Sequence, residues 1–326
     1  MKDLIYGFFA ISLGIFAIFL LYKLLDSLLN LVKSNFKNKL LHIPHLLPAG
    51  ILITLVLVYP IFGTFLLSFK NSSGKKWVGW ENYSELFSSE EFHTILINNF
   101  LWVAFVPTFV VVIGLLVAQL TNQVGPTREK IFKSLIFMPM AISFVSAAAI
   151  WKFMYAYVPP GRPEIGLFNF ILSKIGIETQ TWLMIDRVHL NSFLLMIIIV
   201  WLQTGFSMVL LSAAIKAVPE ETIEASRLDG CSSKQLFFQI IVPQIRGTIM
   251  AVFITVLIGV MKIFDIVLAM TGGNFNTSVL GFEFYKEFFL NANSGLASAI
   301  VVLLVVLISP LIYLQIRTVK HQESMR

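Results

Sequence analysis

Long uninterrupted apolar segments are the feature that most constrains how this chain can fold. Each is about 19–25 residues long, enough to cross a hydrocarbon core of about 30 Å as a helix. The segments are continuous rather than alternating, which argues against a β-barrel. Only 13% of the residues are charged, about half the share in a soluble domain. The chain is therefore predicted to be an all-α membrane protein with about seven transmembrane helices, at residues 4–22, 48–69, 99–120, 134–155, 192–215, 248–270 and 297–316.

The first apolar segment has two interpretations, a signal peptide or a retained helix. No small-residue cleavage site follows it, and the stretch from Lys23 to Lys33 has the pattern of an amphipathic helix. We therefore expect residues 1–46 to form an extra N-terminal transmembrane helix and an amphipathic cytoplasmic linker.

The distribution of basic residues predicts the orientation of the chain. If the segments before the second, fourth and sixth spans and the C-terminus are cytoplasmic, that side holds 14 Lys and Arg residues against 8 outside. The positive-inside rule then places the N-terminus outside and the C-terminus in the cytoplasm. The outer loops are 71–98, 156–191 and 271–296, and their aromatic residues either anchor the chain at the membrane surface or contact an external partner. The net charge of +6 reports this topology and does not indicate nucleic-acid binding.

A polar segment, residues 218–243, interrupts the apolar pattern between the fifth and sixth spans. Pro219 and the acidic residues after it are typical of a helix start. Gly230 can adopt a positive φ and end that helix, and Ser232 or Ser233 can cap a second one. The segment is predicted to be two short cytoplasmic helices joined by a turn. They either dock a partner protein or lie on the lipid headgroups as an amphipathic loop.

The spacing within this segment resembles the EAA loop of binding-protein-dependent ABC importer permeases. That loop has Glu-Ala-Ala, three residues, Gly, nine residues, Ile, one residue and Leu-Pro. Here Glu224-Ala225-Ser226 is followed at the same spacing by Gly230, Ile240 and Val242-Pro243. Ser226 and Val242 are the only departures from the pattern.

Other segments are similar to the sugar-type branch of these permeases. They are Glu81–Phe87, Leu135–Met140, Phe264–Gly273 and Gly295–Ala299, while Trp151–Tyr157, Trp201–Ala214 and Pro219–Glu221 look most like α-glucoside permeases. The resemblance covers about residues 48–317. It implies a permease domain over 47–317 containing the coupling loop 218–245, with a cytoplasmic tail over 318–326.

The resemblance implies a coupling helix that docks in a groove of a separate ATPase subunit. The residues expected to make that contact are Glu224, Ala225, Ser226, Leu228, Asp229 and Gly230. ATP and Mg would be bound by the ATPase subunits, since this chain has no phosphate-binding glycine loop; the chain itself is expected to hold no cofactor, no metal and no catalytic residue. The implied partners are a homologous second permease, two ATPase subunits, an extracytoplasmic solute-binding protein and membrane lipid, all at the bacterial inner membrane.

Polar residues within the spans are candidates for a substrate path. Gln203, Thr204, Phe206 and Ser207 lie in the fifth span, where they either contact the substrate or form hydrogen bonds between helices. Lys262 and Asp265 are three residues apart in the sixth predicted span. We expect them to share a helix face and to form an ion pair, a gate contact or part of the substrate site.

The sequence therefore predicts the transmembrane subunit of an ABC importer for a sugar or glycoside, and not an enzyme. α-Glucosides such as sucrose, trehalose or maltose, or glucosylglycerol, are the expected substrates. The alternatives are an importer for another solute, such as glycerol phosphate or an amino acid, and a secondary transporter or channel that works alone.

Overall fold

A computed structural model of the chain describes residues 43–159 and 161–323, together with scattered positions between 6 and 27. Part of the first predicted span, 4–22, lies outside the described residues. The chain divides into two compact units at Leu66–Leu67. The described residues form helices, with a single isolated bridge between Lys70 and Trp77.

The first unit contains one long apolar helix over Leu46–Leu67. It comprises α3 (Ile43–Ile53), the π-helical turn η1 (Thr54–Val58) and α4 (Tyr59–Leu67). Pro60 lacks an N–H and would clash with the carbonyl one turn earlier. The wider π turn directly before it accommodates that defect, and the Tyr59 N–H bonds to Thr54 O instead. None of the residues from Leu46 to Leu67 is buried by protein, as expected where lipid is the solvent.

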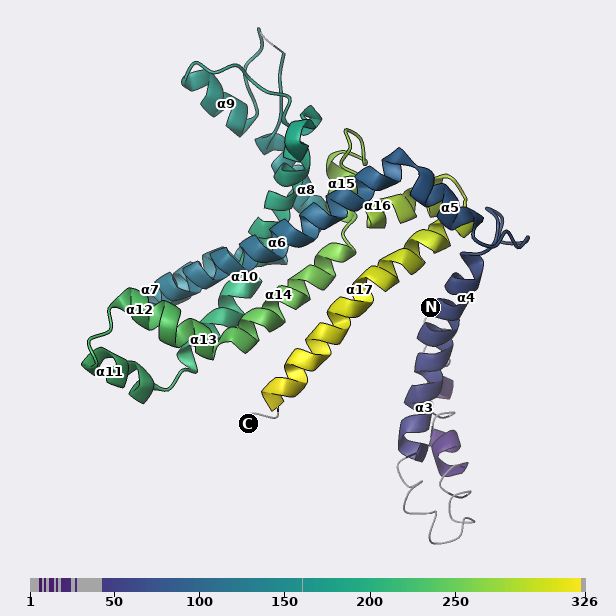
Figure 1. Cartoon of the computed structure of the whole chain (residues 1–326), viewed down its shortest axis with the longest axis horizontal. Helices are drawn as coiled ribbons and strands as arrows, with labels where there is room; N and C mark the ends of the chain where they lie inside the picture. Colours follow the sequence, from purple (N-terminus) through teal and green to yellow (C-terminus); the bar gives the residue numbers. More distant parts are fainter. Residues whose placement is uncertain are drawn as a thin grey trace. The chain divides into compact units, whose positions relative to one another are not determined.

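The second unit is a bundle built around α6 (Glu90–Asn122), α10 (Leu190–Lys216) and α14 (Arg246–Met261), which pack on one another (Figure 1). α17 (Ser294–Glu323) lies against α14. The remaining elements are α5 (Glu81–Ser88), α7 (Pro126–Phe137), η2 (Met138–Ala141), α8 (Phe144–Met154), α9 (Leu167–Lys174), η3 (Trp182–Met184), η4 (Arg187–His189), α11 (Glu220–Leu228), α12 (Ser233–Gln235), η5 (Leu236–Ile241), α13 (Val242–Gln244), α15 (Asp265–Met270), α16 (Leu280–Tyr285) and η6 (Lys286–Leu290).

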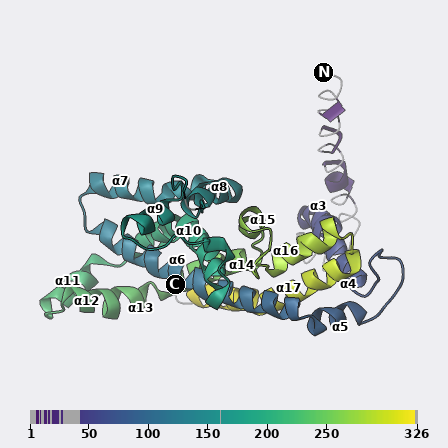
Figure 2. The same ribbon diagram turned by 90° about the horizontal axis from the view of Figure 1, so that it is seen from above.

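Apolar side chains between α6, α10 and α14 form the core of this unit. Trp102 of α6, Met208 of α10 and Val256 of α14 belong to one cluster and are each at most 5% exposed. Close packing of this kind, rather than water exclusion, holds helices together in lipid. Figure 2 and Figure 1 agree that α11–α13 lie at one end of this unit, with α5 and α16 at the other.

Six apolar spans over the described residues agree with the predicted segments 48–69 to 297–316, provided that each bent helix pair counts as one span. The prediction of continuous helices was wrong at two places. The fourth span bends by 102° between η2 and α8, and the sixth predicted span, 248–270, breaks after Met261. A further bend of 69° at Ile245 lies just before that span.

The bend in the fourth span has a local cause. Pro139 lies in η2, and Ile142 and Ser143 that follow are extended, with ψ of 136° and 151°. The Ser143 side chain accepts a hydrogen bond from the Ser146 N–H, which starts α8 afresh in a new direction. The bend directs the start of α8 toward α10 and α15.

Candidate functional site

The polar segment between α10 and α14 folds as the predicted pair of short helices. Pro219 is the N-cap of α11, and Glu220 and Glu221 in the first turn complement the positive end of the helix. Gly230, at φ +83°, ends it: the Gly230 N–H bonds to Arg227 O, and the next N–H, of Cys231, bonds to Ser226 O at 3.1 Å.

The second short helix, α12, begins at Ser233 and is capped by Ser232. The Ser232 side chain accepts a hydrogen bond from the Gln235 N–H, and the Gln235 side chain accepts one from the Ser232 N–H. This reciprocal capping box fixes the turn between the two helices. The turn therefore presents α11 as a preformed element.

α11 has a buried face and a face open to solvent. Ser226 is turned inward and bonds to Thr222 O at 2.7 Å. Glu224, Ala225 and Leu228 share the opposite face at helical spacing, and Leu228 is 89% exposed. Of the six residues predicted for ATPase contact, the structure therefore leaves five exposed and turns Ser226 toward its own chain.

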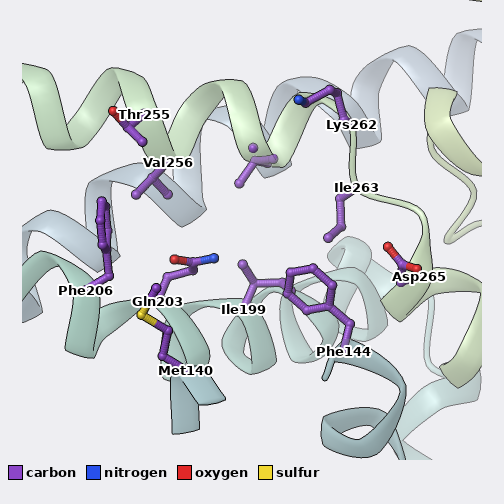
Figure 3. Close-up of a pocket in the computed structure, with 12 residues that line it drawn as sticks. Met140, Phe144, Ile199, Gln203, Phe206, Thr255, Val256, Lys262, Ile263 and Asp265 are labelled. Carbon is purple, nitrogen blue, oxygen red and sulfur yellow. The ribbon is translucent and has the colours of Figure 1, made fainter. Parts of the chain in front are cut away.

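A cavity of about 420 Å³ lies between α10 and α14, at the bend of the fourth span (Figure 3). Its walls are mostly apolar, with Met140, Phe144, Ile199 and Phe206 among the lining residues. The Gln203 amide points into the cavity from α10, and Lys262 and Asp265 lie toward one end. A second cavity of about 370 Å³ shares Met140, Phe144, Gln203 and Asp265 with the first.

The predicted path residues on α10 separate into two faces. Gln203 and Phe206 line the cavity with Ile199, three to four residues away. Thr204 and Ser207 do not line it: Thr204 is buried and bonds to Val200 O of its own helix at 2.6 Å. Ser207 is 0% exposed and packs against Gly114 of α6.

The expectation that Lys262 and Asp265 share a helix face was wrong. α14 ends at Met261, and α15 begins only at Asp265, after Phe264 with φ −146°. The two side chains therefore approach the cavity from different helices, and among the described residues no ion pair joins them.

Sequence reasoning missed two groups of residues. Met140 and Phe144 line both cavities, because the bend after Pro139 brings them beside Gln203. The second group is an ionic cluster around Glu129. Its Oε1 forms ion pairs with Lys133 Nζ and Lys216 Nζ, each at a distance of 2.5 Å. The i,i+4 spacing of Glu129 and Lys133 was a usable signal for one pair, but nothing local indicated Lys216.

Over the part of the chain that the structure describes, no three His, Cys, Asp or Glu side chains are grouped to hold a metal ion. The features that remain are an exposed acidic and apolar helix face at one end of the bundle and a largely apolar cavity within it. A helical membrane bundle with these two features is typical of one class of protein, the helical membrane permeases. The features alone do not say which permease this chain is.

Comparison with known proteins places the chain within that class. Residues 110–317 match the binding-protein-dependent transport system inner membrane component family. The chain belongs to this family, and it is a multi-pass inner-membrane permease of an ABC import system rather than a member of an enzyme class.

Two curated relatives are similar over most of their length. The alpha-glucoside transport system permease protein AglF of Rhizobium meliloti is 44% identical over 280 residues, which is 86% of this chain and 82% of the relative. The osmoprotective compounds uptake permease protein GgtC of Synechocystis is also 44% identical, over 86% of this chain and 99% of the relative.

A solved structure has the same fold. The chain resembles a subunit of a bacterial ABC transporter involved in the import of the acidic polysaccharide alginate, with a TM-score of 0.73. The likeness covers 87% of this chain and 97% of the other at 22% identity. At that identity it supports the permease fold alone.

Proposed function

We propose that the chain is the transmembrane subunit of an ATP-driven importer for a sugar or glycoside, and that α11 couples it to the ATPase subunits. The observation that carries the coupling role is Leu228, a large apolar side chain that is 89% exposed at the end of an acidic helix. Covering such a side chain with a partner removes apolar surface from water. The carboxylates beside it supply charges that a basic groove can pair.

The proposed assembly contains a homologous second permease, two ATPase subunits and an extracytoplasmic solute-binding protein. ATP and Mg would be held by the ATPase subunits. Closure of those subunits would displace α11, and the displacement would change access to the cavity between α10 and α14. The family's dependence on a binding protein supports the external partner.

Variants of α11 test the coupling. Glu224→Lys reverses a charge on the exposed face, and Gly230→Val places a β-branched residue at φ +83°, which costs on the order of 1–2 kcal/mol or more. Both are expected to abolish ATP-dependent uptake in membrane vesicles while the chain still inserts. Gly125→Ala, at an ordinary φ with open space around it, is the matched control. Normal uptake in both α11 variants would show that α11 does not couple this chain to the ATPase subunits.

For the substrate we propose an α-glucoside, such as sucrose, trehalose or maltose, or glucosylglycerol. The 44% identity to permeases named for alpha-glucosides and osmoprotective compounds supports this class. The cavity volume lies within the roughly 300–1,000 Å³ typical of small-molecule sites, and aromatic rings beside an amide suit a sugar. A phosphate-bearing solute is disfavoured, because Lys262 is the one cation among the described residues that line the cavity and the Asp265 carboxylate lies near the same end.

Two neighbouring substitutions test the sugar site. Gln203→Ala removes the amide that points into the cavity and is expected to raise the KM for uptake by about tenfold, the effect of losing one good hydrogen bond. Thr204→Val alters the adjacent residue, whose hydroxyl bonds only within its own helix, and is expected to leave the KM near that of the unaltered chain. Equal KM values for the two variants would argue against this site.

A further inference from the structure

An ionic cluster joins three helices at the same end of the bundle as α11. Oε1 of Glu129 on α7 forms ion pairs with Nζ of Lys133 on the same helix and with Nζ of Lys216 on α10, each at a distance of 2.5 Å. Lys133 also donates to Asn122 at the end of α6, at 3.2 Å, and to Ser212 of α10. Its ammonium group thus uses all three of its donors. We call Glu129, Lys133, Lys216, Asn122 and Ser212 the inner clasp.

The inner clasp is sheltered from water at its centre. The Glu129 and Lys133 side chains are 15% and 21% exposed and Ser212 is 1% exposed, while Lys216 at the edge of the cluster is 53% exposed. The Ser212 hydroxyl donates to Asn122 Oδ1 at 2.7 Å, which closes the network between α6 and α10. Ion pairs that are partly buried and share hydrogen bonds hold geometry better than single surface pairs.

The position of Lys216 connects this network with the coupling helix. Lys216 lies in the last turn of α10, and Pro219, three residues later, is the N-cap of α11. A displacement of α11 is therefore delivered to the helix end that Glu129 holds.

The other end of α7 leads to the cavity. Gly205 of α10 fits against the α7 backbone, where an added Cβ would lie 2.7 Å from Ile136 O. Beyond that point η2 and the start of α8 supply Met140 and Phe144 to the cavity wall. α7 is therefore attached to α10 twice, once at the inner clasp and once beside the cavity.

We propose that Glu129 is a positioning residue which makes α7 move together with α10, so that displacement of α11 shifts one whole wall of the cavity against α14. That wall combines Gln203 on α10 with Met140 and Phe144 beyond α7, and Thr255 and Val256 of α14 lie across the cavity (Figure 3). Without the inner clasp, α7 would be held to α10 only beside the cavity, and Met140 and Phe144 would follow the movement of Gln203 less closely. ATP would still be hydrolysed, but less solute would be carried for each ATP. This inference rests on the proposed coupling role of α11.

The test uses the complete transporter in proteoliposomes and measures both uptake and ATP hydrolysis. Glu129→Gln is expected to lower the ratio of solute carried to ATP hydrolysed by about tenfold, the size expected from losing a charge-assisted hydrogen bond. Lys130→Gln removes a charge from an exposed neighbour on α7 and is expected to leave the ratio unchanged. In the charge swap Glu129→Lys with Lys216→Glu, the new carboxylate faces two lysines, and the ratio should recover.

A second readout separates positioning from mere structural support. With Cys231→Ser removing the lone native thiol, Met140→Cys reports access to the cavity wall through its rate of maleimide labelling. The labelling rate is expected to change between nucleotide-free and vanadate-trapped complexes, and Glu129→Gln is expected to remove that change.

Two outcomes would overturn the proposal. One is an unchanged ratio in Glu129→Gln, which includes uptake and hydrolysis that fall in parallel, and the other is a preserved labelling change in that variant. The Glu224→Lys variant distinguishes this failure from that of the proposed function. If Glu224→Lys uncouples transport and Glu129→Gln does not, only the role of the inner clasp is wrong. If neither does, the coupling role of α11 is wrong as well.

Discussion

Gly205 illustrates how single residues set the distance between helices in this bundle. Small residues let helix backbones approach closely in a membrane, where packing must replace the hydrophobic effect. A Cβ at this position would lie 2.7 Å from both Ile136 O and Phe137 Cα, which are backbone atoms and cannot rotate away.

Gly205→Ala is therefore expected to lower the thermal unfolding temperature of the purified chain in detergent. Overpacking of this kind costs about 1–3 kcal/mol. Gly63→Ala is the control, because nothing lies within 4 Å of its Cβ and Ala is the better helix former. Equal unfolding temperatures for the two variants would contradict the close approach of α7 and α10.

At the scale of residues, the sequence located the polar stretch on α10 but not the orientation of its side chains. Gln203, Thr204, Phe206 and Ser207 look alike as path candidates, since each adds polarity or an aromatic ring to one apolar span. The helix separates successive residues by about 100°, which turns Thr204 away from Gln203. Ser207 lies one turn after Gln203, and it is the packing against Gly114 of α6 that places its side chain away from the cavity. Which face meets the cavity depends on where α14 packs.

At the scale of elements, the loop between α8 and α10 is organised by a single amide. Asn169 of α9 is 0% exposed and donates to Ala156 O and Gln180 O at 2.9 and 3.0 Å. Its Oδ1 accepts from the Gln180 N–H and from Trp182 Nε1. Four hydrogen bonds thus hold both ends of the loop to one short helix.

Asn169→Leu is expected to open this loop locally, because each buried partner left unpaired costs about 1–3 kcal/mol. The loop holds trypsin sites at Lys174 and Arg187. Cleavage of the chain at these sites in spheroplasts should therefore become faster. Ser173→Ala, which removes one exposed hydrogen bond from the same helix, should cleave at the rate of the unaltered chain. Identical rates in all three chains would show that Asn169 does not organise the loop.

Also at the scale of elements, the breaks in the fourth and sixth spans could not be predicted from the sequence, and the reason is physical. Apolar length alone reports that a segment is buried in lipid or protein, and Pro139 marks only a probable interruption. The change of direction after η2 exists because α8 packs against α15 and α10, which come much later in the chain.

At the scale of the whole molecule, the lone thiol tests the predicted orientation. Cys231 lies in the turn between α11 and α12 and is partly exposed. If this turn is cytoplasmic, a membrane-impermeant maleimide should label it in inside-out vesicles but not in intact spheroplasts. Bound ATPase subunits should slow the reaction by covering α11.

A chain carrying Cys231→Ser and Glu178→Cys is the matched control, since residue 178 is exposed in the loop 156–191. Its labelling should show the reverse pattern. Labelling of Cys231 from outside would overturn the predicted orientation. The domain boundaries at 46/47 and 317/318 stay predictions, and so does the first predicted span, part of which lies outside the described residues.

The sequence by itself determined the membrane class, the positions of the apolar spans from 48–69 onward, though not their breaks, and the two-helix form of the polar segment 218–243. These depend on local properties: apolar length, the φ that Gly230 permits and the cap that Ser232 provides. Only the tertiary structure decided the cavity, the separation of Lys262 from Asp265 and the inner clasp. Each of these depends on contacts between helices that are distant in the chain. The pattern of residues along the sequence does not show which faces of those helices pack together.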